Sequence, residues 1–296
     1  MKLSYCFIVN PVAGKGKAAK LIPLIQKQME EKNLKFKIKK TSYNGEGKAL
    51  AVEALEEGYN VIVAVGGDGT INEIISGVYS LEGIIAIIPA GTGNDFARSL
   101  NISTDFYNAI SNIINGTATE IDAGFIDNKV FINVASIGLD AHIAAEANKL
   151  KRYFTGTKAY IISLLKGLIT YHSIKVKIVM DNTTIDKRIM LAAFCNGAYY
   201  GGGMNIAPTA DPTDNLLDIC IVEDMPKLKL LWLFPTIFKG QHTVFKEVKA
   251  YRAKKLLIYS DKEMIINTDG EVSTYNPKNQ EALTVKIATH RLKIIK

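Results

Sequence analysis

An apolar run that ends in a glycine-rich turn constrains this chain more than any other feature. Residues 61–65 read VIVAV, the turn that follows reads GGDG, and the next apolar residues recur with the spacing of one helix face: Ile71, Ile74, Ile75 and Val78. A strand that is apolar on both faces belongs in a sheet that is covered on both sides. The stretch therefore predicts a strand, a turn and a helix that packs on the sheet.

The same alternation of strand and helix fills the first part of the chain. Strands are expected at residues 3–10, 35–41, 60–65 and 83–89, with helical patterns between them. Strands separated by helices indicate a parallel sheet, and such sheets bind ligands beyond the carboxyl ends of their strands. We therefore expect a binding site at the glycine turns that follow the last two of these strands.

The pattern changes after about residue 122. Two hairpins are expected, one turning at Asp127–Asn128 and the other near Asp181–Asn182, and several short strands with polar turns follow. Helical interruptions are expected at residues 138–170 and 227–238. This half of the chain therefore predicts a mostly antiparallel, β-rich fold.

These patterns predict two domains. We expect an α/β domain over residues 1–122 and a β-rich domain over residues 123–296, whose last few residues can return to the first domain.

The composition limits the class of protein. The chain has 296 residues, of which 48% are hydrophobic and 22% charged, and these values exclude disordered and fibrous classes. No stretch reaches the roughly 18 apolar residues that a membrane-spanning helix requires, and the first residues are too short and too strand-like for a signal peptide. We therefore expect a cytoplasmic protein.

The charge and the cysteines restrict the partners further. A formal net charge of +7 favours an anionic partner, but no nucleic-acid-binding motif accompanies it, so we expect no nucleic acid partner. Cys6, Cys195 and Cys220 lie in separate apolar runs without the spacing of a zinc site. We expect all three thiols in the core.

The first glycine turn carries a carboxylate, Asp68, where a phosphate would approach the backbone. A bare carboxylate would repel that ligand, whereas magnesium accepts carboxylate and phosphate oxygens together. The sequence therefore predicts that Asp68 holds magnesium. Thr70 and Glu73 have the spacing of a capping box, which gives Glu73 a structural explanation.

The second turn has the same arrangement. Gly91 and Gly93 are followed by Asn94 and Asp95, before a helix expected from Phe96. Asp95 alone would be interpreted as a helix N-cap. The presence of an aspartate in both turns instead favours a shared site for metal and phosphate.

Six blocks follow one another along the chain: VNPVAGKGKA, GGDGTINEI, IPAGTGNDFARSL, FINVASIGLDA, YYGGGMNIAPTADPTDNLLDICIV and NTDGEV. In this order they resemble the bacterial diacylglycerol kinases and related lipid kinases, and also the eukaryotic diacylglycerol, sphingosine and ceramide kinases. GGDGT alone is shared with NAD kinases, whereas the six blocks together span nearly the whole chain. The resemblance implies that residues 1–122 form an NAD kinase-like α/β nucleotide-binding domain with a parallel sheet, and that residues 123–296 form a mostly antiparallel, β-sandwich-like lipid-substrate domain.

The resemblance also implies a nucleotide site. ATP would be the co-substrate, Mg²⁺ the cofactor, and Asp68 and Asp95 would organise the magnesium and the phosphates. The family's nucleotide contacts correspond here to Asn10, Thr41, Gly66, Gly67, Asp68, Gly69, Thr70, Ile71, Asn72 and Thr92.

Two further sites are implied in the second half. Asp269 and Glu271 match the two acidic positions where the family has its general base, although Asp-Gly by itself is more typical of a hairpin turn. Asp214 would bind a second, structural magnesium, with Asp211 and Leu216 contributing. Asn215 stands where many relatives have glycine, and a polar turn before a strand is the alternative interpretation.

The expected function is phosphorylation of a lipid hydroxyl, with diacylglycerol giving phosphatidic acid. The alternatives are an NAD kinase and a non-catalytic module that binds nucleotide or lipid. We expect the lipid at an acidic membrane surface, contacted peripherally through residues 148–167 or 227–240, although ordinary packing would also explain these helices. A sheet edge in the second domain would permit a homodimer.

Overall fold

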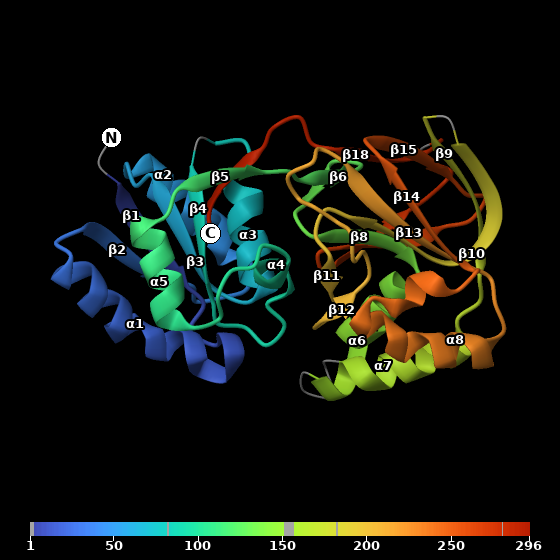
Figure 1. Ribbon diagram of the computed structural model, residues 1–296, viewed down its shortest axis with the longest axis horizontal. Helices are drawn as coiled ribbons and strands as arrows, with labels where there is room; N and C mark the ends of the chain where they lie inside the picture. The colour runs from blue at the N-terminus through green and yellow to red at the C-terminus, as the bar shows by residue number, and fades with distance from the viewer. Residues whose placement is uncertain (1–2, 82, 151–156, 182, 280) are drawn as a thin grey trace. The chain divides into compact units, whose positions relative to one another are not determined.

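The computed structural model describes residues 3–81, 83–150, 157–181, 183–279 and 281–296. The chain divides into two compact units. The first unit combines Met1–Ala123 with Thr289–Lys296, and the second is Gly124–Ala288. Both can be followed along the chain in Figure 1.

The first unit is built on a six-stranded sheet. Its strands are, in spatial order, β2 (Lys35–Lys40), β1 (Ser4–Val9), β3 (Val61–Gly66), β4 (Ile84–Pro89), β19 (Leu292–Ile295) and β5 (Ala118–Ile121). Neighbours from β2 to β19 pair in parallel, whereas β5 pairs antiparallel with β19. The predicted parallel sheet is confirmed, with the addition of an antiparallel edge.

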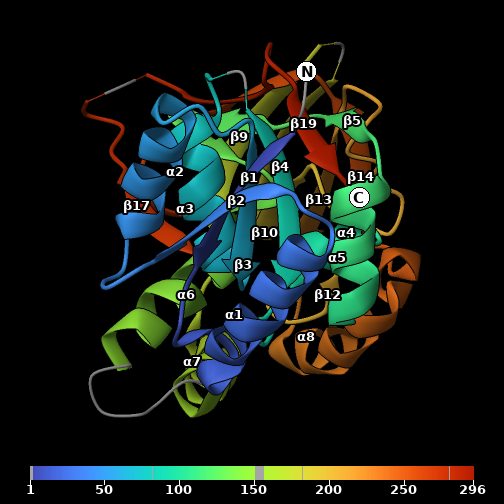
Figure 2. The ribbon, with the colours of Figure 1, turned by 90° about the vertical axis from the view of Figure 1, so that its left-hand side faces the viewer.

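Helices cover both faces of this sheet. The unit contains α1 (Ala13–Glu31), α2 (Glu46–Glu56), α3 (Asp68–Val78), the short α4 (Asp95–Ser99) and α5 (Phe106–Asn115). α1 packs with α5 on one face and α2 packs with α3 on the other (Figure 2). The sheet is therefore the middle layer of three.

The alternation of side chains along β3 explains these layers. Val61, Val63 and Val65 join the apolar core beneath α1 and α5, and successive residues of a strand point to opposite faces. Ile62 and Ala64 are equally buried. Because burial of each valine or isoleucine side chain stabilises the fold by roughly 1.5–3 kcal/mol, such a strand is stable only between two helical layers.

The second unit is built on an eleven-stranded antiparallel sheet. Its strands are β6 (Gly124–Ile126), β7 (Lys129–Phe131), β8 (Val134–Gly138), β9 (Ile174–Met180), β10 (Thr183–Cys195), β13 (Leu217–Glu223), β14 (Val248–Ala253), β15 (Lys255–Tyr259), β16 (Met264–Thr268), β17 (Glu271–Tyr275) and β18 (Leu283–Ile287). β11 (Tyr199–Tyr200) and β12 (Met204–Asn205) form a separate ribbon.

Strand β10 is shared by the two halves of this sheet. Its first half pairs with β9, and its second half pairs with β8 and β13 after an irregularity between Ile189 and Leu191. The inward residues of these strands form one apolar core. The predicted antiparallel, sandwich-like fold is confirmed, as are the hairpins β6–β7 and β9–β10.

Helical segments cover one outer face of the sheet. They are α6 (Leu139–Leu150), α7 (Thr157–Thr170), α8 (Lys227–Leu233) and the 3₁₀ helices η1 (Phe234–Lys239) and η2 (Gln241–Val244). They share a second apolar core with β8, β10 and β13. The helical interruption expected at 227–238 is confirmed, and so is the one at 138–170 except at positions 151–156, which lie outside the described residues. No helix of the described residues is long and apolar enough to cross a membrane.

The predicted capping box at Thr70 and Glu73 is wrong. α3 begins at Asp68, its N-cap is Gly67, and no side chain caps it. The Glu73 carboxylate instead accepts hydrogen bonds from the N–H groups of Gly45 at 2.9 Å and Gly47 at 3.1 Å. These amides lie at the N-terminus of α2, so Glu73 caps the neighbouring helix across 28 and 26 residues of sequence.

We predict that Glu73→Ala lowers the free energy of unfolding by about 1–2 kcal/mol, since it removes a charged acceptor from two helix amides. Urea denaturation measures this. Glu30→Ala, an exposed glutamate of α1, is the matched control and should change the midpoint little. Equal midpoints for the two variants would contradict this role for Glu73.

Candidate nucleotide and lipid sites

The two glycine turns meet backbone to backbone. β3 and β4 are adjacent parallel strands, and Gly66 at the end of β3 lies opposite Pro89 at the end of β4. A Cβ atom added to Gly91 would lie 2.3 Å from the Cα atom of Gly67. Any side chain there would push the turns apart, so glycine is required for this contact rather than for a strained φ angle.

Asp68 links the two turns. It is the first residue of α3, and its Oδ1 accepts a hydrogen bond from the backbone N–H of Phe96 at 3.0 Å. Phe96 lies in the first turn of α4, where unpaired N–H groups favour an acceptor or a negative charge. The carboxylate is thus partly neutralised by the turn that faces it.

Asp95 lies at the start of α4 but is not its N-cap. The cap is Asn94, with φ at +55°, and its Oδ1 accepts a hydrogen bond from the Gly91 N–H at 2.9 Å. The N-cap interpretation of Asp95 is therefore wrong by one residue. The buried Asp95 carboxylate pairs with Arg98 at 3.0 Å, which supplies a counter-charge within the same helix.

Asn10 and Thr70 connect the end of β1 to the first turn. The Asn10 side-chain amide donates to the Thr70 hydroxyl at 3.0 Å, and its backbone N–H donates to the Val65 carbonyl at 3.1 Å. A Cβ added to Gly14, whose φ is +58°, would lie 2.1 Å from the Ala90 carbonyl oxygen. The loop after β1 therefore touches the second turn as well.

The remaining predicted nucleotide contacts follow the same edge of the sheet. Thr41 comes directly after β2, and its N–H donates to the Val9 carbonyl at 2.9 Å. Thr92 lies in the turn after β4, and the buried Ile71 and Asn72 lie in the first turns of α3. The structure thus brings these positions to the carboxyl ends of neighbouring parallel strands, where α/β sheets bind ligands.

Asp68 has the donor chemistry that magnesium uses with nucleotides. No group of three or more His, Cys, Asp or Glu side chains that could hold a metal occurs in the described part of the chain. Magnesium is commonly bound by one or two carboxylates together with substrate phosphates, rather than by a cage of protein ligands. A partly accessible aspartate in a glycine-rich turn fits that pattern.

In the second unit, Asp269 lies in the tight turn of the β16–β17 hairpin. Asp269 and Gly270 both have positive φ, +47° and +95°, so the hairpin-turn interpretation is confirmed. The Asp269 carboxylate accepts hydrogen bonds from three consecutive backbone N–H groups, those of Ile132, Asn133 and Val134, at 2.7, 3.2 and 2.8 Å. Its position is therefore fixed by the segment that leads into β8.

Glu271 lies in a different environment. It is the first residue of β17 and is exposed to solvent. The two acidic positions of this block thus differ: one carboxylate is held by backbone amides, whereas the other is accessible.

The loop of Asp211, Asp214 and Leu216 has a cationic partner of its own. The Asp214 carboxylate accepts a hydrogen bond from the Leu216 N–H at 3.0 Å and pairs with the Arg252 guanidinium. Asp211 accepts from the Thr213 hydroxyl at 2.6 Å, and Asn215 has φ at +60°. Both carboxylates thus have hydrogen-bond partners within the protein, and the magnesium assignment stays a prediction.

Two family models match nearly the whole chain. The diacylglycerol kinase catalytic domain matches residues 4–126, and the YegS C-terminal NAD kinase beta sandwich-like domain matches residues 133–295. The chain belongs to the diacylglycerol kinase family. It is therefore a phosphotransferase of the lipid kinase type, for which ATP is the co-substrate.

Relatives within this family share its full length. A diacylglycerol kinase of Mycobacterium tuberculosis is 32% identical over 90% of both chains, and one of Staphylococcus carnosus is 28% identical over 98% of this chain and 95% of its own. A crystal structure from Bacillus anthracis strain Sterne, of a protein assigned to the same kinases, has a TM-score of 0.78 at 25% identity and covers 99% of this chain and 96% of that one.

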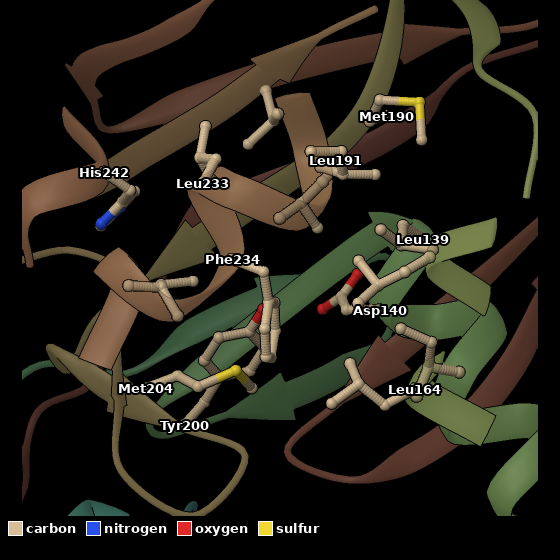
Figure 3. Close-up of a pocket in the computed structure, with 15 residues that line it drawn as sticks. Leu139, Asp140, Leu164, Met190, Leu191, Tyr200, Met204, Leu233, Phe234 and His242 are labelled. Atoms are coloured by element: carbon tan, nitrogen blue, oxygen red, sulfur yellow. The ribbon is translucent and has the colours of Figure 1, made fainter. Parts of the chain in front are cut away.

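The second unit of this kinase contains a cavity that the sequence analysis missed. It lies between α6, α7, α8, η1 and the sheet and is partly open to solvent (Figure 3). Its lining is almost entirely aliphatic or aromatic, with Asp140, Tyr200 and His242 as the polar exceptions. A sequence signal did exist, since Asp140 follows Leu139 at the start of an otherwise apolar helix face.

Asp140 is an ionisable group in an unfavourable environment. Part of the residue is accessible, but its Oδ2 is buried and has no hydrogen-bond partner, whereas Oδ1 accepts from the Ala141 N–H at 2.8 Å. Burial raises the pKa of this carboxyl from 3.8 to about 7, and the nearby Ser136 hydroxyl and backbone amides only partly oppose that rise. The neutral form is therefore favoured below pH 7.

We predict that Asp140 makes the protein less stable as the pH rises. Because its pKa is raised on folding, the folded state retains a proton that the unfolded state loses between about pH 4 and pH 7. Its contribution should fall by about 2.5 kcal/mol from pH 5 to pH 8. Asp140→Asn should remove this slope in urea denaturation, while Asp186→Asn, an exposed carboxylate of β10, should retain it. Parallel slopes for wild type and Asp140→Asn would exclude this contribution.

Proposed function

We propose that the protein is an ATP- and magnesium-dependent kinase that transfers the γ-phosphate to the free hydroxyl of diacylglycerol, which yields phosphatidic acid. The observation that carries this proposal is the pair of touching glycine turns bridged by Asp68. Full-length relatives named diacylglycerol kinase support the choice of acceptor.

The roles of the first unit follow from its geometry. Gly66 to Gly69 and Gly91 to Gly93 would let phosphate oxygens reach backbone N–H groups, and Asn10 holds the Thr70 hydroxyl beside the first turn. Asp68 would hold magnesium together with Asp95. When bound, magnesium neutralises charge on the phosphate oxygens during transfer.

We assign the removal of the proton from the lipid hydroxyl to either Asp269 or Glu271. The three amide donors to Asp269 occupy lone pairs that a base would use, but they also fix its position. Glu271 is exposed and has lone pairs available. Both therefore stay candidates, with positioning and electrostatics supplying most of the rate.

A transfer assay with radiolabelled ATP distinguishes the alternatives. Mixed micelles would present diacylglycerol and other lipid alcohols, and NAD would be offered separately because the GGDGT turn and the description of the second domain are shared with NAD kinases. Label in phosphatidic acid supports the proposal. Label in NADP supports an NAD kinase, and label in neither supports a non-catalytic binding module.

We predict that Asp68→Asn reduces phosphoryl transfer by roughly 100-fold or more, because an amide cannot hold magnesium as a carboxylate does. The amide oxygen can still accept the Phe96 N–H, so the melting temperature should change little. Initial rates at saturating ATP measure the effect.

Asp105→Asn is the matched control for this change. Asp105 caps α5 in the same unit by accepting the Asn108 N–H at 2.9 Å, and asparagine can also cap a helix. This variant should retain wild-type rates. Full activity of Asp68→Asn would refute the metal assignment.

We further propose that residues 227–244 contact an acidic membrane surface. Leu228, Trp232 and Val244 are 82%, 71% and 81% exposed, and lysines at 227, 229 and 239 accompany them. Exposed apolar side chains with nearby lysines are the pattern of an interfacial helix. In the other expected stretch, residues 148–167, positions 151–156 lie outside the described residues.

We predict that Leu228→Ala with Trp232→Ala weakens binding to vesicles of phosphatidylglycerol by roughly tenfold or more, because each large side chain loses apolar area that the bilayer would bury. Vesicle sedimentation measures the partition coefficient. Tyr107→Ala, which removes an exposed aromatic of the first unit, is the control. Unchanged partitioning of the double variant would exclude this surface.

A further inference from the structure

The short segment that leads into β8, residues 132–134, pairs its backbone with two distant residues. The N–H groups of Ile132, Asn133 and Val134 donate to the Asp269 carboxylate, and the Asp269 N–H donates to the Val134 carbonyl at 3.1 Å. The Ile132 carbonyl accepts from the Asn196 side-chain amide at 2.7 Å, and the Asn133 carbonyl accepts from the Asn196 N–H at 2.8 Å. Buried backbone groups require such partners, so Asp269 and Asn196 together determine where this buried segment lies.

We refer to residues 132–134, Asn196 and Asp269 as the joint. Its side-chain contacts span 64 and 137 residues of sequence. The joint brings together the blocks FINVASIGLDA and NTDGEV, and it reaches the block that begins at Tyr199, because the Asn133 side-chain amide donates to the Tyr199 carbonyl at 2.5 Å. Three blocks that the candidate nucleotide site does not use therefore meet in one hydrogen-bonded cluster of the second unit.

The hydrogen bonds of Asp269 favour a carboxylate that stays ionised. An ionised carboxylate only accepts hydrogen bonds and has about four lone-pair sites, and three amides already use this one. Uptake of a proton from the lipid hydroxyl would neutralise the charge that strengthens all three bonds. A base at this position would therefore loosen the joint during transfer, when the reacting groups have to stay closely aligned.

The joint also holds the turn that carries Glu271. Asp269 and Gly270 form the turn of the β16–β17 hairpin, and Glu271 is the first residue of β17. The Asn267 side chain accepts a hydrogen bond from the Gly270 N–H at 3.0 Å. Both turn residues thus have polar contacts that fix them, and the exposed Glu271 follows directly.

We propose that Asp269 and Asn196 are positioning residues of the phosphoryl transfer: together they hold residues 132–134 and the β16–β17 turn in place, and Asp269 takes no proton during the reaction. The inference rests on the proposed function, because it assigns roles within the site of that reaction. It also gives Asn196, which the sequence analysis did not single out, a part in the reaction.

Two substitutions of Asp269 distinguish a positioning residue from a base. Asparagine and glycine both tolerate its φ of +47°, and neither accepts a proton. Asp269→Asn retains an oxygen for the N–H groups of Asn133 and Val134, whereas Asp269→Gly loses all three bonds.

We expect kcat to fall by roughly tenfold for Asp269→Asn and by roughly 100-fold or more for Asp269→Gly. The KM for ATP should stay unchanged in both, because the substitutions affect alignment rather than nucleotide binding. Steady-state kinetics of the full chain measure these values. Equal losses of kcat in the two variants would overturn the proposal, since removal of a base affects both alike.

Asn196→Ala tests the joint while Asp269 stays intact. It removes the side-chain donor to the Ile132 carbonyl, so kcat should fall by roughly tenfold. The double variant with Asp269→Asn should lose less than the product of the two single losses, because both changes displace the same segment. Losses that multiply would refute a shared joint.

Asn276→Ala is the matched control for Asn196→Ala. Its side-chain amide donates to Glu263 at 2.8 Å in a solvent-exposed contact of the same unit. The control should retain the wild-type kcat. An Asn196→Ala variant with the same kcat as this control would contradict the positioning role of Asn196.

Hydrogen exchange of the full chain tests the joint without turnover. The amides of residues 132–134 should exchange roughly tenfold or more faster in Asp269→Gly than in wild type, because they lose their acceptor. Amides of β3, in the first unit, should exchange as in wild type and so report that the variant is folded. Unchanged exchange at residues 132–134 would overturn the proposal.

The outcomes separate this inference from the proposed function. Faster exchange in Asp269→Gly, without transfer to any lipid by wild type, would support the joint and refute the proposed function. Transfer to diacylglycerol with equal losses in the two Asp269 variants would support the proposed function and refute the positioning role of Asp269.

Discussion

The contact between the backbones of Gly67 and Gly91 is the constraint on which the candidate nucleotide site depends. Only residues without a Cβ allow the ends of β3 and β4 to come so close. That proximity lets Asp68 reach the N-terminus of α4 and sets the carboxylate between two turns. The charge inside the first turn therefore has two explanations that coexist: it satisfies a helix amide, and it offers an acceptor to a cation.

Local patterns predicted the layers of this protein but not its long-range polar contacts. Residues 61–65 are all apolar, so their burial in a sheet covered on both faces could be predicted from this run alone. Glu73 caps α2, whose first amides lie 28 and 26 residues before it in the sequence. No spacing rule within a single helix predicts such a contact. The three amides that donate to Asp269 could not be predicted for the same reason, since they precede Asp269 by about 135 residues.

The acidic residues of the candidate sites and of the cavity differ in how many partners the fold already gives them. Asp95 has Arg98, Asp214 has Arg252 and Asp269 has three amides, whereas Asp140 retains an unpaired oxygen in an apolar space. A satisfied carboxylate contributes to structure whether or not a ligand is present. A buried carboxylate oxygen without a partner destabilises the folded state, and family motifs identified in the sequence do not distinguish the two conditions.

The position of β19 affects how the chain can fold during synthesis. This strand lies between β4 and β5, yet its residues, 292–295, come after the whole second unit. During synthesis from the N-terminus, β4 has no partner on that edge until residues 292–295 have been made, and an open strand edge favours aggregation. The first unit therefore completes its sheet only after the whole second unit has been synthesised, although most of its own strands precede that unit.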